Sequence, residues 1–236
     1  MTVFSVSQVN SLRAKAVKAC PDPGDGPSGW TKSKIDPMRL LSVFASLRMK
    51  SGFVLRAYQF RAGGNGNGLV LAIPYDAPFP EPKDCPNVEG PPQPLGSSED
   101  LMAFIGGDGK PWSYLSASIF SREAGEFGAM WHGCFWSTHI ILGTDPWHLD
   151  LTSEDRRKHF PHASGTADEW NWKLARPEVW EPTFEQDGEV VTIQFHTFSG
   201  LGQEAIYRWT DTYKLDCYNF ETTEEVVAEG SGGFVF

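Results

Sequence analysis

The residues with the greatest potential for chemistry are concentrated between positions 130 and 162. This stretch holds five of the six histidines of the chain, three of its nine tryptophans and one cysteine. Imidazoles can bind metals, transfer protons or form hydrogen bonds, and indole rings can stack on a flat ligand. We therefore expect a functional site here first. The residues concerned are His132, His139, His148, His159, His162, Trp131, Trp136, Trp147 and Cys134.

Metal binding is one chemistry that these histidines could support. His159 and His162 are three positions apart, so a single turn can bring them together, and His148 precedes them. A catalytic zinc ion needs about three protein ligands and an open position. A metal-assisted hydrolase that uses the cluster His132–His162, with a divalent metal such as zinc, is therefore one alternative function. The chain has no HExxH motif, so the simpler interpretation is that these histidines are ordinary surface or core residues, and no cofactor is predicted.

Covalent catalysis is a second possibility, with Cys134 as the nucleophile and His132 or His139 as its base. A reactive cysteine normally lies near positive charge or at a helix N-terminus, which lowers the pKa of its thiol. Cys134 instead lies among aromatic residues, as buried and inert cysteines do. The sequence also lacks the GxSxG motif of a serine hydrolase. These patterns leave open whether the chain is an enzyme.

A binding pocket for a small molecule is the function that the residue types favour. Trp131, Trp136 and Trp147 could stack on a flat or sugar-like ligand, although any one of them could instead fill the core. His196 and Arg208 are polar groups within predicted strands. If the sheet curves around a cavity, these two side chains become ligand contacts in an aromatic and histidine-lined pocket.

The composition indicates an ordinary globular protein. Of the 236 residues, 40% are hydrophobic and 21% are charged, with a net charge of −10. Residues 1–61 contain ten Lys or Arg and three acidic residues, so they carry +7 and the remainder −17. This asymmetry raises a second alternative, a protein-interaction or structural module. No basic run is dense enough to indicate a nucleic-acid partner, and the sequence does not predict an oligomeric state.

Cysteine spacing and hydropathy indicate the cellular environment in which the chain folds. The four cysteines are far apart and form no CxxC pair, which argues against a zinc knuckle or a disulfide framework. No apolar run approaches the ~18 residues of a membrane helix, so no membrane partner is expected. The N-terminus lacks the apolar core of a signal peptide. The sequence therefore predicts a soluble, cytoplasmic protein.

Periodicity and turn residues predict an α+β fold in a single compact domain spanning residues 1–236. Its antiparallel meander sheet is mostly C-terminal and packs with N-terminal helices. The proline-rich segment 74–96 is predicted to be a long loop, with a possible weak domain boundary. We expect helices over residues 7–19, 36–50, 97–105 and 111–128. We expect strands over residues 53–60, 69–73, 129–142, 189–198, 204–214, 215–220 and 225–228.

On the predicted strand 189–198, side chains alternate between two faces. Val191, Ile193 and Phe195 would face one way, and Thr192, Gln194 and His196 the other.

Overall fold

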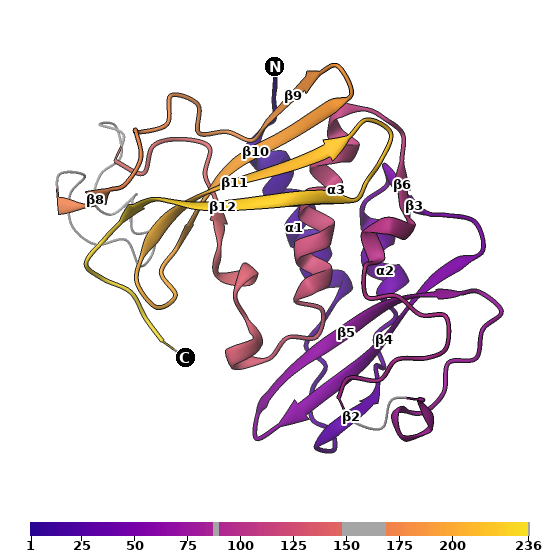
Figure 1. The fold of residues 1–236 in the computed structure, drawn as a ribbon. Helices are drawn as coiled ribbons and strands as arrows, with labels where there is room; N and C mark the ends of the chain where they lie inside the picture. Colours follow the sequence, from indigo (N-terminus) through magenta and orange to yellow (C-terminus); the bar gives the residue numbers. More distant parts are fainter. Residues whose placement is uncertain (87–89, 148–168, 236) are drawn as a thin grey trace. The chain divides into compact units, whose positions relative to one another are not determined.

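The computed structural model describes residues 1–86, 90–147 and 169–235. It confirms the α+β class and the mainly C-terminal antiparallel sheet (Figure 1). The chain groups into two compact units. Unit 1 comprises Met1–Ser11, Ser137–Leu215 and Phe220–Phe236, and unit 2 comprises Leu12–Trp136 and Asp216–Asn219. The boundary considered near residues 74–96 falls inside unit 2, and the single-domain organisation stays a prediction of the sequence.

Unit 1 is built around a seven-stranded antiparallel sheet with the order β1-β9-β10-β11-β12-β8, in which β7 also pairs with β10. The strands are β1 (Thr2–Val3), β7 (Ile140–Ile141), β8 (Asn171–Trp172), β9 (Thr183–Asp187), β10 (Val190–Ser199), β11 (Ala205–Lys214) and β12 (Phe220–Glu229). The predicted meander is therefore confirmed. Of the two short strands expected after residue 214, residues 225–228 lie within the longer β12, which pairs with β11 from Phe220 to Glu229. The strand expected over residues 215–220 is wrong except at Phe220, because the chain turns there between β11 and β12.

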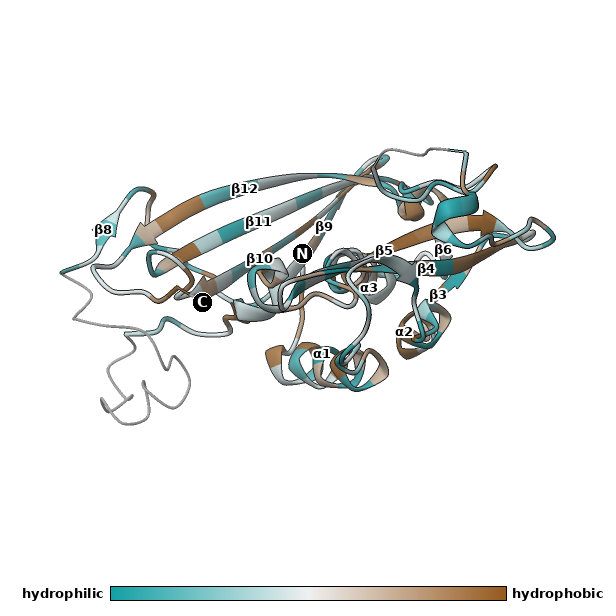
Figure 2. Ribbon diagram, turned by 90° about the horizontal axis from the view of Figure 1, so that it is seen from below, coloured by the Kyte–Doolittle hydropathy of each residue, from teal (hydrophilic) through white to brown (hydrophobic). Residues whose placement is uncertain are grey.

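The two faces of β10 differ as the alternation predicts. Val191, Ile193 and Phe195 are completely buried, whereas Thr192 and Gln194 on the other face are partly exposed. Toward the β8 end of the sheet the interior is hydrophobic, as the brown end of β12 shows (Figure 2). The buried residues of this cluster are Leu142, Trp170, Trp180, Phe198, Ile206, Val227 and Ala228.

Unit 2 contains two smaller sheets and most of the helical residues. Strands β2 (Gly29–Lys32), β4 (Phe53–Ala62) and β5 (Asn65–Pro74) form one antiparallel sheet, and β3 (Leu47–Met49) pairs with β6 (Ile105–Gly107). The predicted hairpin is confirmed, but it is longer than expected. Its turn is only Gly63-Gly64, whose positive φ values of 57° and 88° suit the tight turn between two twisted strands.

The described chain has three α-helices, α1 (Val6–Ala19), α2 (Pro37–Val43) and α3 (Pro111–Gly125). The predicted start of α2 is confirmed, because the Asp36 carboxylate accepts the backbone N–H of Met38 at 3.0 Å. Its predicted extension to Lys50 is wrong, since Leu47–Met49 instead uses its backbone groups to pair with β6. The predicted helix 97–105 is reduced to a 3-10 turn over Leu101–Phe104. None of the helices of the described chain has the length and hydropathy needed to cross a membrane.

The predicted buried strand over residues 129–142 is wrong for most of its length. Only Ile140–Ile141 is a strand, and 3-10 turns cover Trp131–Gly133 and Trp136–Thr138. The Glu126 carboxylate accepts the backbone N–H groups of both Phe135 and Trp136. Backbone N–H groups that donate to a side chain cannot pair with a neighbouring strand. The Glu126 carboxylate therefore prevents a strand here, despite the β-branched and aromatic composition of the stretch.

Candidate functional site

A cavity of about 430 Å³ lies in unit 1 beside the polar face of β10. This volume falls within the range of roughly 300–1,000 Å³ that is usual for small-molecule sites. Its walls come from β9, β10, β11 and the segment 175–179. The lining residues are Met1, Ala175, Arg176, Pro177, Glu178, Val179, Thr183, Glu185, Thr192, Gln194, His196, Arg208 and Val227.

The sheet register positions the polar wall of this cavity. Thr192, Gln194 and His196 alternate along β10 and therefore project to one side of the sheet. On β9, Thr183 lies opposite Gln194, and on β11 Arg208 lies opposite His196. A one-residue slip in either strand pairing would turn these side chains to the other face, so the register itself builds the site.

The segment 175–179 forms the facing wall and is held in place at its beginning. The backbone N–H groups of Lys173 and Leu174 both donate to the carbonyl of Val227, at 2.9 and 3.2 Å. Arg176 forms an ion pair with Asp145 at 2.6 Å, and its guanidinium lies 5.1 Å from the ring centroid of Trp172. These contacts secure a segment that lies outside any strand or helix.

His196 is the most deeply buried polar group of the wall, with only 4% of its surface exposed. Its ring lies 5.6 Å from that of Trp180. The pKa of His196 is lowered to about 4, mainly by burial; a hydrogen bond to the backbone of Trp180 opposes the shift, and the nearby charge of Arg208 adds to it. At neutral pH the imidazole is therefore uncharged. Its Nδ1 atom is buried without a hydrogen-bond partner among the described residues.

The charged groups of the wall include two arginines that already have acidic partners. Nε and Nη2 of Arg208 both donate to the same carboxylate oxygen of Glu225, at 3.0 and 2.8 Å. Arg176 is paired with Asp145 as described above. Glu178 and Glu185 also line the cavity and are exposed to solvent.

Of the residues proposed from sequence, the structure brings His196 and Arg208 together in this cavity. His139 also belongs to unit 1 and is buried, but it has other contacts. Its Nδ1 lies 2.8 Å from Oγ1 of Thr197, and its ring packs against those of Tyr207 and Trp209, at 5.0 and 5.7 Å. These contacts are those of a core histidine.

Trp147 packs into the hydrophobic cluster of unit 1 and does not line the cavity. Its ring lies 4.7 Å from Trp170 and 5.9 Å from Trp172, in both cases edge to face. Edge-to-face pairs of this kind stabilise a core. In this cluster Trp147 contributes packing.

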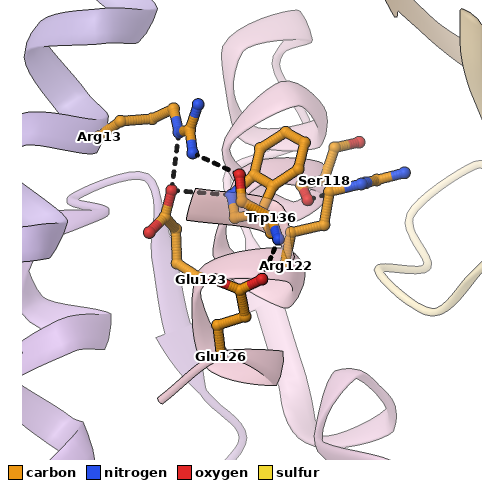
Figure 3. A network of polar contacts seen from close by, with 6 residues as sticks. All are labelled: Arg13, Ser118, Arg122, Glu123, Glu126 and Trp136. Carbon is orange, nitrogen blue, oxygen red and sulfur yellow. Dashed lines mark hydrogen bonds and ion pairs between the residues drawn. The ribbon is translucent and has the colours of Figure 1, made fainter. Parts of the chain in front are cut away.

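Trp136 belongs to unit 2, where a polar network surrounds its ring (Figure 3). Its indole N–H donates to Glu123 at 2.9 Å, and the same carboxylate oxygen accepts from Arg13 at 2.8 Å. The guanidinium groups of Arg13 and Arg122 lie 4.3 and 5.6 Å from the Trp136 ring centroid. Both the N–H group and the faces of the ring are therefore occupied by the protein itself.

Trp131, His132 and Cys134 lie in or beside the 3-10 turn Trp131–Gly133 of unit 2. Trp131 is 57% exposed, has an unusual positive φ of 46° and stacks on His132 at 6.0 Å. His132 is exposed and Cys134 is partly buried. The contacts of these residues do not identify them as a nucleophile and its base, so their catalytic role stays a prediction.

The three candidate metal ligands His148, His159 and His162 lie outside the described residues. Within residues 1–86, 90–147 and 169–235, no group of three or more histidine, cysteine, aspartate or glutamate side chains is arranged to hold a metal ion. His132 and His139 belong to different compact units. The described chain therefore offers no geometry on which to develop the metal hypothesis.

Sequence reasoning missed Thr183 and the facing segment 175–179 as parts of the site. The polar alternation of Thr192, Gln194 and His196 was visible in the sequence, and it is the signal that leads to the sheet wall. Nothing in the composition of residues 175–179 indicates that they lie across from that face.

Comparisons with models of known protein families, with curated proteins and with solved structures find no significant match to this chain.

Proposed function

We propose that unit 1 binds a small organic molecule in the cavity beside His196. The observation that carries the proposal is the cavity of about 430 Å³, into whose sheet wall the register places the polar residues Thr192, Gln194 and His196. A concave site of this size with a few convergent polar groups is typical of small-molecule binding.

The protonation behaviour of His196 favours binding over proton transfer. A general base works best when its pKa lies near the pH at which it operates. Burial and Arg208 hold the pKa of His196 at about 4, so it is a weak base at neutral pH. A neutral imidazole nonetheless remains a good hydrogen-bond acceptor. His196 is therefore better suited to orient a ligand than to remove a proton from it.

The ligand contacts of this proposal differ from those expected from sequence. His196 and Arg208 remain, and Thr183, Thr192 and Gln194 join them. The tryptophans proposed as stacking surfaces do not line this cavity. The site is thus mainly a polar wall with small apolar residues opposite, including Pro177 and Val179.

The proposal can be tested by filling the cavity. A chemically mixed collection of small metabolites would be screened for an increase in the melting temperature of the full chain. Thr192→Trp places a large ring in the cavity, whereas Gln186→Trp places it at an exposed position of β9 that pairs with Val191, on the other face of the sheet. A compound that stabilises the wild type and the Gln186 variant, but not the Thr192 variant, would support the proposal. Equal stabilisation of all three proteins, or none of the wild type, would refute it.

A further inference from the structure

The outer edge of β12 in unit 1 is paired at one end only. β8 pairs there with Ala228 and Glu229, and no other strand of the described chain lies on this side of β12 (Figure 1). β11 occupies the opposite side along the whole strand, from Phe220 to Glu229. Residues 221–226 therefore form an open strand edge. Backbone N–H and C=O groups on such an edge can pair with another extended segment.

The side chains along this edge are accessible and acidic. Residues 221–224 are exposed, and β12 contains four glutamates and no basic residue. Glu221, Thr223 and Glu225 project to one face of the sheet, because side chains alternate along a strand. A strand added at the edge would place alternate side chains beside these three residues.

β8 and the residue after it show how this edge binds an extended segment. β8 is itself an antiparallel strand of two residues added to the end of β12. Directly after it, the backbone N–H of Lys173 donates to the carbonyl of Val227 at 2.9 Å. The ammonium group of Lys173 forms an ion pair with Glu229, also at 2.9 Å. The edge thus binds a segment through its backbone and a lysine through its glutamate, and its open part offers both kinds of contact again.

The charges of the edge favour a basic segment over a second copy of the chain. Pairing of two β12 strands would bring the glutamates of both copies together. Like charges on paired strands destabilise a sheet, whereas opposite charges stabilise it. Glu225 and Glu229 already have cationic partners, Arg208 and Lys173. Glu221 has no ion-pair partner within the described chain, so it is the carboxylate that an added basic residue would neutralise.

We propose that the open edge of β12 binds an extended segment of a partner protein, rich in lysine or arginine, as an added antiparallel strand. Backbone hydrogen bonds along residues 221–226 would hold the segment. Its basic side chains, at alternate positions, would lie beside Glu221 and Glu225. Addition of a strand to an exposed sheet edge is a general mode of peptide recognition. The proposal does not depend on a ligand in the cavity beside His196.

The first test is binding of a synthetic peptide to the full chain, measured by isothermal titration calorimetry. The peptide Lys-Val-Lys-Thr-Lys-Val-Lys, with blocked termini, presents its lysines on one face of a strand. The same peptide with glutamate in place of every lysine is the charge control. We expect saturable binding of the lysine peptide and no binding of the glutamate peptide. Binding of the glutamate peptide, or of neither peptide, would overturn the proposal.

Backbone modification separates strand addition from simple attraction between charges. Two versions of the lysine peptide carry N-methyl groups at alternate residues, one at the lysines and the other at the residues between them. Only one edge of an added strand faces β12, so one version should lose binding and the other should keep it. Equal affinities of the two versions would mean that no strand is added, and the proposal would be wrong.

Two variants with the same change in net charge locate the contact. Glu221→Lys alters the open edge, whereas Asp187→Lys alters an exposed position of β9, which β10 and β11 separate from β12. The first should weaken binding of the lysine peptide about fivefold or more, and the second should leave the affinity within about twofold of the wild type. Thermal melting shows whether both variants are folded. Equal weakening in both would refute a contact with β12.

Sedimentation of the wild type tests the alternative occupant. We expect the peptide to bind the wild-type chain without competing with self-association. A wild-type dimer that excludes the peptide would assign the edge to a second copy of the chain and overturn the proposal.

Discussion

His196 on β10 and Arg208 on β11 lie directly opposite each other in the antiparallel sheet, and both line the same cavity. The imidazole is buried and uncharged at neutral pH, whereas the guanidinium is held by Glu225. A neutral imidazole thus lies beside a guanidinium group whose charge is balanced by Glu225. This relationship determines the response of the protein to acid.

The stability of unit 1 should decrease in acid because of His196. The folded state keeps this histidine neutral down to a pH of about 4, whereas the unfolded chain protonates it below about 6.5. Between these values the unfolded state binds more protons, so the free energy of unfolding falls as the pH falls through this window. The expected loss is roughly 3 kcal/mol when the pH has dropped below 4.

Urea unfolding of the wild type and of His196→Gln, from pH 7.5 to pH 4, measures this effect. The variant should lose less stability over the window, because it lacks the titrating ring. Parallel curves for the two proteins would show that His196 does not cause the acid sensitivity.

Removing Arg208 should raise the pKa of His196. Burial is the largest cause of the low value and would remain, so the pKa should rise above 4 but stay below 6.5. Arg208→Met removes the nearby positive charge and leaves the Glu225 carboxylate without this partner, which acts in the same direction. NMR titration of the His196 ring gives the pKa directly. Lys214→Met, which removes an exposed cation from the end of β11, should leave it unchanged. Similar shifts in both variants would refute a local effect of Arg208.

The Glu123 carboxylate should be important for the stability of unit 2. It accepts from both Arg13 and Trp136, and the ion-paired side chains are only 13% and 11% exposed for Arg13 and Glu123. Glu123→Ala would leave the guanidinium with its charge poorly compensated and the indole N–H without its carboxylate acceptor. The free energy of unfolding should fall by on the order of 3 kcal/mol.

An ion pair on the surface of the same unit serves as the control. Lys32 and Glu81 are 3.2 Å apart, with side chains 35% and 55% exposed. Glu81→Ala should cost less than about 1 kcal/mol. Urea denaturation gives the free energy of unfolding of both variants. Equal losses would mean that Glu123 stabilises the protein no more than a surface ion pair does.

Two glycines should respond in opposite directions to replacement by alanine. A Cβ atom at Gly68 would lie 2.1 Å from the backbone oxygen of Phe127, a contact that a side-chain adjustment cannot relieve. Gly68→Ala should therefore destabilise the protein by about 2 kcal/mol or more.

A Cβ atom at Gly125, at the end of α3, would meet nothing within 4 Å. Gly125→Ala should raise stability by a few tenths of a kcal/mol, up to about 1 kcal/mol. Thermal melting checks both signs, and a stable Gly68→Ala protein would contradict the close approach of β5 to Phe127.

Local patterns were sufficient to predict much of the fold. The alternation of Val191, Ile193 and Phe195 predicted β10, and Asp36 followed by Pro37 predicted the start of α2. Such signals come from neighbours in the chain, whose periodicity and capping groups act over a few residues. They failed where a side chain outside the predicted element bound its backbone N–H groups. The Glu126 carboxylate converted the expected strand around Phe135 into turns.

Periodicity, capping residues and polar alternation were enough to predict the α+β class, the antiparallel meander and the polar face of β10 that carries His196. The contacts of each candidate side chain depend instead on the tertiary structure. Trp136 finds its acceptor on α3, and that acceptor is shared with Arg13, 110 positions before Glu123 in the chain. His196 instead lies in a cavity wall with an unsatisfied Nδ1. Both outcomes depend on strand register and on segments that meet across long separations in the chain, which no local pattern encodes.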